Sequence, residues 1–371
     1  MNHDTVLTGA LIFDPVEGAT KRRDVLLRGD RIVAVESDVE GAERVDCAGG
    51  LLLPGLIDCH AHVAFPRPDE LPRSARILEA VPVLRGLLKR GVTTVRDAWG
   101  ADAGFKHALR EGWITGPDLL ISLRQLSPTG GLGDHWSPDA GTVDTLADPS
   151  LPDPVFDGPD AARAAVRRMV RAGADWIKAG ASGALRSVRA GLDIGPSDEE
   201  LHALVDEARR CGRDVLAHAH TARSAVAAAE AGARSIEHGV FLDESAVGVL
   251  RERGCWYVPT LAPIDEPAHL RSLALAREAG VPIAAGSDLA PRPHVDLLTE
   301  LRLLAAGGLG DAGALAAATS EAARLLRLDH DRGRIAPGLR ADLLLLAGTE
   351  LDVRDLAGRI RQVWRNGQTV L

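Results

Sequence analysis

The sequence predicts an α/β fold: a (β/α)8 barrel of the TIM type beside a small β domain that both ends of the chain build together. Three observations lead to this prediction. The length of 371 residues suits one barrel, which takes about 250 residues, plus a smaller domain. A helix–glycine–strand pattern recurs along the middle of the chain. The two ends carry strand-like runs that could not bury a β face separately.

The recurring unit is an amphipathic stretch rich in Ala, Leu and Arg that ends at a glycine and is followed by a short apolar run. It occurs at Gly91, Gly173, Gly212, Gly232, Gly254 and Gly280. Each glycine lies where a helix C-cap needs a left-handed residue. Each apolar run has the length and composition of a buried parallel strand. With Leu56–Val63 and Leu119–Leu126, eight strands are expected, which favours a barrel over an open sheet.

The ends of the chain have a different pattern. Two strand-like runs flank Gly29-Asp30, and Asn366-Gly367 is a hairpin turn signal. We therefore expect residues 1–53 and 334–371 to form one small β domain beside a barrel of residues 54–333. The stretch from Ser127 to Pro159 is rich in Gly, Pro and Asp and lacks periodicity, so we expect a loop at the mouth of an active site.

Composition excludes several classes of protein. Hydrophobic residues make up 46% of the chain and charged residues 26%, and the formal net charge of −9 argues against nucleic-acid binding. No apolar stretch reaches the roughly 20 residues that span a bilayer, and we identify no signal peptide. The four cysteines form no CxxC pair, which favours free thiols in a reducing compartment. We expect a cytoplasmic enzyme with a small-molecule substrate and no membrane partner, and whether it forms a homo-oligomer is left open.

The residues that end the predicted strands indicate the chemistry, because the C-terminal strand ends of a barrel build its active site. These residues are His60, His62, Arg96, Asp97, Lys178, His218, His220, His238, Thr260 and Asp288. Side chains two apart on a strand face the same way. Each signal alone has an ordinary reading: two incidental histidines, a histidine in a turn, or an aspartate at a helix N-cap. Together they supply the nitrogen and oxygen ligands that zinc and similar ions take.

Lys178 adds a compositional signal. The chain contains only four lysines among its 43 basic residues, and Lys178 is the one that ends an apolar strand. A buried lysine paired with an acid would explain it. A desolvated lysine can also lose its proton, which arginine does not do. The neutral amine could then take up carbon dioxide as a carbamate and bridge two metal ions.

Seven segments together resemble the amidohydrolase superfamily in order and spacing: "PGLIDCHAH", "GVTTVRDA", "DWIKAG", "VLAHAH", "SIEHG", "GVPIAAGSD" and "GRIAPGLRADLLLL". The resemblance implies a metal-dependent hydrolase with a distorted (β/α)8 barrel and a small composite β-sandwich formed by both termini. It implies two divalent ions, with zinc as the expected metal. His60 and His62 would bind the first metal, His218 and His238 the second, and the carbamate of Lys178, formed from CO2, would bridge them. Asp288 would bind the first metal and shuttle protons.

Within the superfamily, the chain is most similar to prolidase-like and imidazolonepropionase-like amidohydrolases. Leu132 stands where these relatives have a histidine in a Thr-Gly-Gly-His-Gly loop, although His135 follows three residues later. His220 stands where relatives often have a tyrosine. Both positions are expected to touch the substrate, so a dipeptidase specificity does not transfer directly.

The resulting prediction is hydrolysis of an amide-type C–N bond in an N-acyl amino acid, a dipeptide or a cyclic amide. A metal-bridging hydroxide would attack, Asp288 would carry the proton, and His220 would hydrogen-bond the substrate or the tetrahedral intermediate. Further candidate substrate contacts are His135, Ser182, Arg186, Arg189, Tyr257, Arg292 and His294.

Three alternatives stay open. A lactone or phosphotriester hydrolase could use the same fold. A mononuclear deaminase is a further alternative, but such relatives place a glutamate where this chain has Thr221. A metal-free, non-catalytic scaffold should show gaps among the six ligand positions, and the sequence has none.

Overall fold

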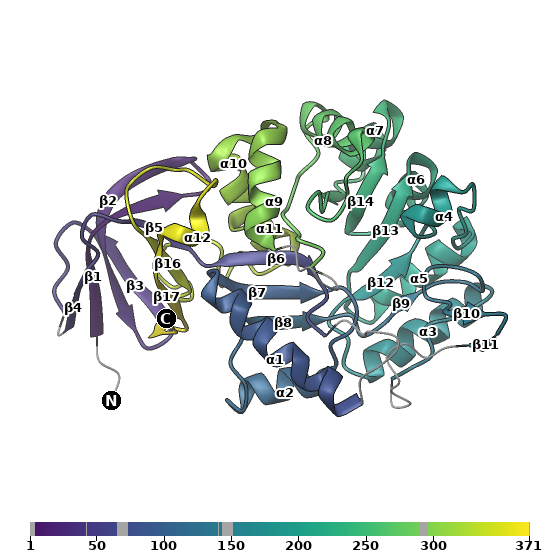
Figure 1. Ribbon diagram of the computed structural model, residues 1–371, viewed down its shortest axis with the longest axis horizontal. Helices are drawn as coiled ribbons and strands as arrows, with labels where there is room; N and C mark the ends of the chain where they lie inside the picture. The colour runs from purple at the N-terminus through teal and green to yellow at the C-terminus, as the bar shows by residue number, and fades with distance from the viewer. Residues whose placement is uncertain are drawn as a thin grey trace.

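A computed structural model describes residues 4–41, 43–64, 73–139, 141–142, 151–289 and 296–370. The molecule is elongated: a β region that contains both chain ends lies beside a larger region of strands and helices (Figure 1).

The β region is built on one eight-stranded sheet in the order β18-β17-β16-β5-β1-β2-β3, with β4 paired to β1. Its strands are β1 (Asp4–Asp14), β2 (Ala19–Arg28), β3 (Arg31–Glu36), β4 (Glu43–Asp46), β5 (Leu51–Pro54), β16 (Leu343–Leu346), β17 (Ile360–Arg365) and β18 (Gln368–Thr369). Strands β5 and β16 are antiparallel, with Leu343 opposite Pro54. The two ends of the chain therefore share one sheet.

Local turn chemistry explains the hairpins of this sheet. Asn366 and Gly367 connect β17 to β18 and both have positive φ, 53° and 72°, as a tight hairpin turn of the I′ type requires. Gly29, with φ of 58°, begins the turn between β2 and β3. A separate hydrophobic cluster, formed mostly by side chains of this sheet such as Leu52 and Trp364, is its core.

The larger region contains two sheets of parallel strands. One has the order β6-β7-β8 and the other β15-β14-β13-β12-β9. Their strands are β6 (Leu56–Ala61), β7 (Val92–Asp97), β8 (Asp118–Ile121), β9 (Gln125–Leu126), β12 (Ile177–Gly180), β13 (Val215–Thr221), β14 (Ser235–Phe241) and β15 (Trp256–Val258). A third pair, β10 (Trp136–Ser137) and β11 (Gly141–Thr142), lies within the predicted loop between Ser127 and Pro159.

The structure differs from the eight predicted strands at two places. The run from Leu119 to Leu126 is two strands, because Leu123 adopts a left-handed φ of 65° and β8 and β9 join different sheets. The apolar run after Gly280 forms no named strand. It makes isolated parallel bridges, Ile283 with Tyr257 and Leu289 with Ala61, and so contacts both sheets.

Helices cover the outer faces of both sheets (Figure 1). They are α1 (Arg73–Lys89), α2 (Ala103–Arg110), α3 (Pro159–Arg171), α4 (Leu185–Arg189), α5 (Asp198–Arg210), α6 (Ala222–Ala231), α7 (Glu244–Glu252), α8 (Pro267–Ala279), α9 (Leu297–Leu304), η1 (Ala305–Leu309), α10 (Gly310–Ala317), α11 (Ser320–Leu325) and α12 (Leu356–Arg359). All six glycines predicted to end helices have positive φ. Ser197 begins α5 with a capping box completed by Glu200.

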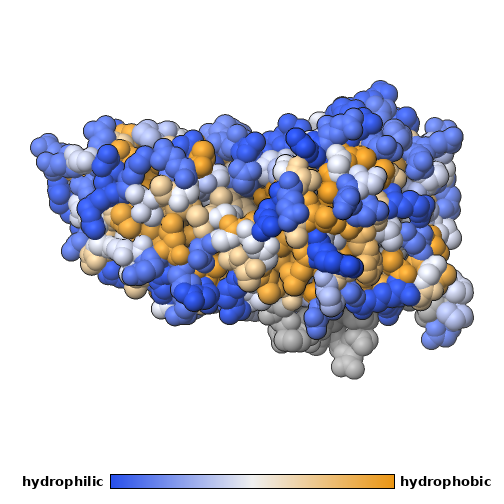
Figure 2. Space-filling model, turned by 90° about the horizontal axis from the view of Figure 1, so that it is seen from above, coloured by the Kyte–Doolittle hydropathy of each residue, from blue (hydrophilic) through white to orange (hydrophobic). Residues whose placement is uncertain are grey.

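The main hydrophobic core lies between these helices and the strands. A smaller cluster, which includes Trp176, Trp256 and residues of α11, connects both parallel sheets. Seen from above, the surface is mostly hydrophilic at its edges, with hydrophobic residues gathered along the middle (Figure 2). In the part of the chain that is described, no helix is long and apolar enough to cross a membrane.

Candidate metal centre

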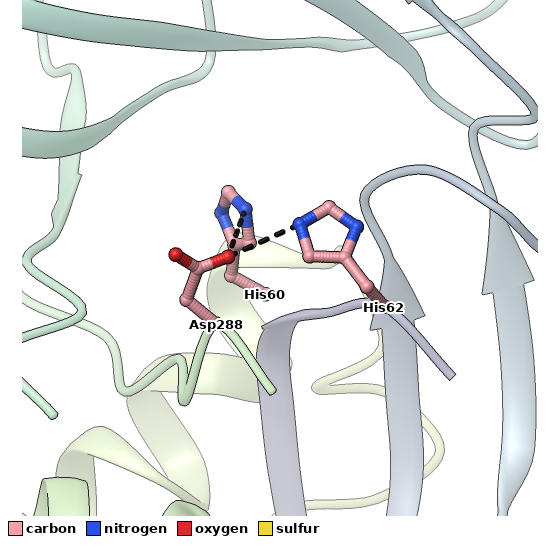
Figure 3. A group of neighbouring side chains, drawn as sticks. All are labelled: His60, His62 and Asp288. Carbon is pink, nitrogen blue, oxygen red and sulfur yellow. Dashed lines mark ion pairs between the residues drawn. The ribbon is translucent and has the colours of Figure 1, made fainter. Parts of the chain in front are cut away.

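The first group of candidate ligands comes from β6, from the residue just after it, and from the segment after Ile283. The side chains of His60 and His62 both point toward Asp288, whose Oδ1 lies 3.5 Å from His60 Nε2 and 3.1 Å from His62 Nε2 (Figure 3). The ligand atoms of these three residues lie within 4.8 Å of one another. Alternation along β6 brings the two imidazoles to one face, and the Leu289–Ala61 bridge brings Asp288 beside them.

The second group comes from β13 and β14 in the other sheet. The ring centroids of His218 and His238 are 4.6 Å apart, and that of His220 is 4.5 Å from His218. The two groups meet because the His60 and His238 rings are 5.0 Å apart. Lys178 of β12 completes the set, with its Nζ 3.3 Å from His60 Nε2. The six predicted metal ligands and His220 therefore gather at one place.

The backbone is strained where three chain segments reach this centre. His238, Thr260 and Asp288 have φ of 71°, 55° and 47°, in the left-handed region that residues other than glycine rarely adopt. Such conformations persist where the surrounding structure holds them, and they cluster at functional sites.

Each of the four candidate histidine ligands uses one ring nitrogen to contact a protein oxygen. The contacts are His60 Nδ1 with Glu237 Oε2 at 2.5 Å, His62 Nδ1 with the Trp99 carbonyl at 2.8 Å, His218 Nε2 with the Gly183 carbonyl at 3.2 Å, and His238 Nδ1 with Thr260 Oγ1 at 2.7 Å. Metal-binding histidines typically donate their second nitrogen in this way. The donor set therefore fits divalent ions such as zinc.

Burial keeps the imidazoles in the form that metals bind. Desolvation lowers the pKa of His60, His218 and His238 well below the usual value, and neighbouring basic groups lower it further. Burial likewise lowers the pKa of His220 to about 3. These rings are therefore neutral near pH 7, as metal binding requires.

The two remaining polar groups have different electrostatic environments. Burial raises the pKa of Asp288, but the contact with His62 and the nearby Lys178 ammonium outweigh it, so the net pKa is lowered. The Lys178 side chain is 2% exposed, and burial lowers its pKa to about 8 even though Glu237 and Asp288 raise it. An appreciable fraction of the Lys178 amine is therefore neutral near physiological pH.

The residues of this centre occur within a sequence match to a known family. A model described as the amidohydrolase family matches residues 51–370. The chain belongs to this family. It is 29% identical to an ochratoxinase of Aspergillus niger over 98% of this chain and 86% of that protein. It is 30% identical to an imidazolonepropionase of Paracoccus denitrificans over 81% of this chain and 80% of that protein.

A solved structure gives the same family. The crystal structure of a prolidase complexed with N-methylphosphonate-L-proline superposes with a TM-score of 0.88 at 33% identity and covers 99% of both chains. The predicted resemblance to prolidase-like and imidazolonepropionase-like amidohydrolases is confirmed. This amidohydrolase is a hydrolase that acts on C–N bonds.

Two of the residues predicted to contact substrate, Tyr257 and Ser182, lie against the histidines of the centre. Tyr257 is fully buried, and its hydroxyl donates to the His238 carbonyl at 2.9 Å. Ser182 is also fully buried, and its hydroxyl accepts a hydrogen bond from the His220 backbone nitrogen at 3.0 Å. Both contact the backbone of histidines of the centre, and their contact with substrate stays a prediction.

The other predicted contacts are more peripheral. The His135 ring stacks on Trp99 at 5.6 Å, and Trp99 packs edge-on against His62. Arg186 is exposed on α4. Arg189 pairs with Glu266 at 2.6 Å, which leaves it less available to a substrate. Arg292 and His294 lie outside the described residues.

Sequence reasoning missed two buried acids of this amidohydrolase. Glu237 and Asp58 are both fully buried, in β14 and β6. The available signal was an acid inside a predicted buried strand, since acids are rarely buried unless they are paired. Glu237 also shares a strand face with Ser235, two residues away.

Proposed function

We propose that this amidohydrolase uses two divalent metal ions to hydrolyse an amide-type C–N bond in a small molecule. One observation carries the proposal: four buried histidines from two sheets, each with one nitrogen held by a protein oxygen, converge with Lys178 and Asp288. An arrangement that only filled a core would not collect so many metal-binding groups.

The residues divide into two sets of ligands. His60, His62 and Asp288 would hold one ion, and His218 and His238 the other. Lys178 lies beside His60 Nε2, and its lowered pKa supports reaction of the neutral amine with CO2. The resulting carbamate would be an anion placed between the two sets. Zinc is the expected metal, because the donors are nitrogen and carboxylate oxygen.

When bound, such ions would lower the pKa of a water molecule and polarise the substrate carbonyl. The chain itself would move the proton. Asp288 would accept the proton of the attacking water and pass it to the leaving nitrogen, so the products are a carboxylic acid and an amine. The Asp288 side chain suits this role, since it is 18% exposed and its lowered pKa keeps it ionised before the reaction.

His220 is the group we assign to the substrate. It is 3% exposed, and its Nδ1 has no hydrogen-bond partner among the described residues. A buried polar atom without a partner costs stability, and a bound substrate or a tetrahedral intermediate could provide the missing hydrogen bond.

The proposed architecture follows from the two parallel sheets. We infer that they form the wall of a distorted (β/α)8 barrel of residues 54–333, in which the segment after Gly280 replaces a regular eighth strand. Residues 1–53 and 334–371 would then form a composite β-sandwich. A cytoplasmic location stays part of the proposal.

The substrate class is proposed from the relatives. An N-acyl amino acid, a dipeptide or a cyclic amide would have the bond that the names ochratoxinase, prolidase and imidazolonepropionase suggest. Deamination is less favoured, since Thr221 caps α6 and hydrogen-bonds Asp193 where a deaminase needs a glutamate. Lactones and phosphotriesters remain alternative substrate classes.

The test is metal analysis combined with a hydrolysis screen. Purified protein should contain close to two divalent ions, lose activity with a chelator and regain it when zinc is added. The panel would contain N-acyl amino acids, dipeptides, cyclic amides, lactones and phosphotriesters. Protein that retains no transition metal after growth in zinc-supplemented medium would contradict the proposal and favour the metal-free scaffold.

A further inference from the structure

A buried ion pair links the two parallel sheets beneath the metal centre. Arg96 of β7 and Glu237 of β14 are both fully buried, and Arg96 Nη2 lies 3.0 Å from each oxygen of the Glu237 carboxylate. The Ser235 hydroxyl donates to Glu237 Oε1. Arg96 also donates from Nε to the Cys59 carbonyl of β6. The Glu237 carboxylate is therefore held from two sides.

The same carboxylate contacts His60. Glu237 Oε2 lies 2.5 Å from His60 Nδ1. An ionised carboxylate can only accept hydrogen bonds, so the proton of the neutral imidazole must be on Nδ1. The lone pair is then on Nε2, the nitrogen that faces Asp288 and Lys178. Glu237 thus selects the tautomer of His60 that can bind a metal from inside the centre.

His60 differs from the other three candidate ligands in this contact. His62 and His218 contact backbone carbonyls, and His238 contacts the hydroxyl of Thr260. A carboxylate is a stronger acceptor than these neutral oxygens, and it draws the Nδ1 proton away from the ring. Electron density at His60 Nε2 rises as a result, which strengthens that nitrogen as a ligand.

We propose that Glu237, fixed by Arg96 and Ser235, is a positioning residue that makes the site of His60 and His62 the tighter of the two metal sites. This inference rests on the proposed metal-dependent function. The metal-free protein should take up its first ion at His60 and His62, with the second following at His218 and His238.

The first measurement needs no metal. Nitrogen-15 NMR of histidine-labelled, chelated protein reports which ring nitrogen carries the proton, and a His60→Asn sample identifies the His60 signals. We expect His60 to be protonated on Nδ1. Protonation on Nε2, or an even mixture of tautomers, would overturn the inference, whatever the outcome of the mutations.

The second measurement is competitive zinc titration against a chelator of known affinity. Wild type should bind two zinc ions in two separate steps. Glu237→Gln should lower the zinc affinity of the tighter site, at His60 and His62, about 10–100-fold. Thr260→Ala is the matched control, because it removes the neutral partner of His238. It should lower the zinc affinity of the site at His218 and His238 only. Equal affinity of the tighter site in wild type and Glu237→Gln would overturn the inference.

A neutral double variant separates positioning from stability. Glu237→Gln alone leaves the Arg96 charge buried without its partner, which could unfold the protein. Arg96→Gln combined with Glu237→Gln removes both charges, so this double variant should fold. Its zinc affinity at His60 and His62 should still be lowered. A double variant with wild-type zinc affinity would contradict the inference. If wild type itself binds no metal, the proposed function fails. If it binds two ions and Glu237→Gln has no effect, only this inference fails.

Discussion

The carboxylate of Asp58 accepts two hydrogen bonds from Ser287, the residue immediately before Asp288. The Ser287 backbone nitrogen lies 2.9 Å from Asp58 Oδ1, and the Ser287 hydroxyl lies 2.5 Å from Oδ2, across 229 residues of sequence. This contact holds Asp288 in its left-handed conformation beside His60. An acid at the centre of β6 therefore positions the proposed proton carrier.

Ser287→Ala should lower both stability and turnover. The mutation removes one hydrogen bond to a buried carboxylate, so we expect about 1–3 kcal/mol of destabilisation in chemical denaturation. Because Asp288 also loses its fixed position, kcat should fall while metal content is retained. Ser245→Ala, at an exposed position on α7, is the control and should change neither property. Wild-type kcat in Ser287→Ala would show that the contact does not position Asp288.

Lys178→Arg should lose at least one metal ion and essentially all activity. Arginine keeps the positive charge but cannot form the carbamate, and it would place a permanent cation between the two sets of ligands. Lys106→Arg is the matched control, since Lys106 pairs with Asp175 at the surface, where arginine serves equally well. Metal analysis and turnover provide the test. A Lys178→Arg protein with two ions and near-normal turnover would end the carbamate proposal.

Lys178→Ala should be inactive too, but for a reason that can be reversed. Removing the side chain leaves space where the carbamate would lie. Added formate or acetate should therefore restore part of the activity of Lys178→Ala, and none of that of Lys178→Arg, where the space is filled. Rescue of both variants to the same degree would argue against this explanation.

Asp288→Asn should keep most of its metal while kcat falls by at least about 100-fold, the usual contribution of a general acid–base group. The amide can still contact His62 but cannot carry a proton. Asp102→Asn is the control, because asparagine caps helix α2 as well as aspartate does. Retention of more than about a tenth of wild-type kcat would assign proton transfer to another group.

His220→Ala should lower kcat/KM without changing metal content. The unpartnered Nδ1 of His220 is buried beside His218 and His238, but we assign it to the substrate. His202→Ala, on the exposed face of α5, is the control and should leave both quantities unchanged. Loss of metal from His220→Ala would instead identify His220 as a ligand.

The burial of the Glu300 carboxyl group leads us to expect that stability depends on pH. It is fully buried in α9, where its Oε2 accepts a hydrogen bond from the Ala262 backbone nitrogen at 2.8 Å, and burial raises its pKa to about 8. In the unfolded chain the pKa of glutamate is about 4.3. Between these two values the folded state holds one more proton than the unfolded state, so stability falls as pH rises.

Glu300→Gln removes this titration. In chelated protein, the melting temperature of wild type relative to Glu300→Gln should therefore decrease steadily from pH about 4.3 to about 8. Denaturation scans across this range would measure it. Parallel curves for the two proteins would show that the pKa of Glu300 is not raised in the folded state.

The sequence by itself determined the local structure and pointed to most of the candidate metal ligands. Glycines that end helices, such as Gly232 and Gly280, depend on a left-handed conformation that other residues adopt at a cost. The period of two along a strand predicts that His60 and His62, at the end of β6, share a face, and that His218 and His220 of β13 share another. These features depend on neighbours in the chain, so a sequence pattern reveals them.

Only the tertiary structure decided how distant segments meet. The break at Leu123, the bridges of Ile283 and Leu289 and the burial of Tyr257 all arise from packing between segments far apart in sequence. The contacts of Glu237 with Arg96 and of Asp58 with Ser287 connect residues more than a hundred positions apart. A period of two fixes which face a side chain takes, but the partner on that face depends on the register and curvature of the sheets, which local preferences do not specify.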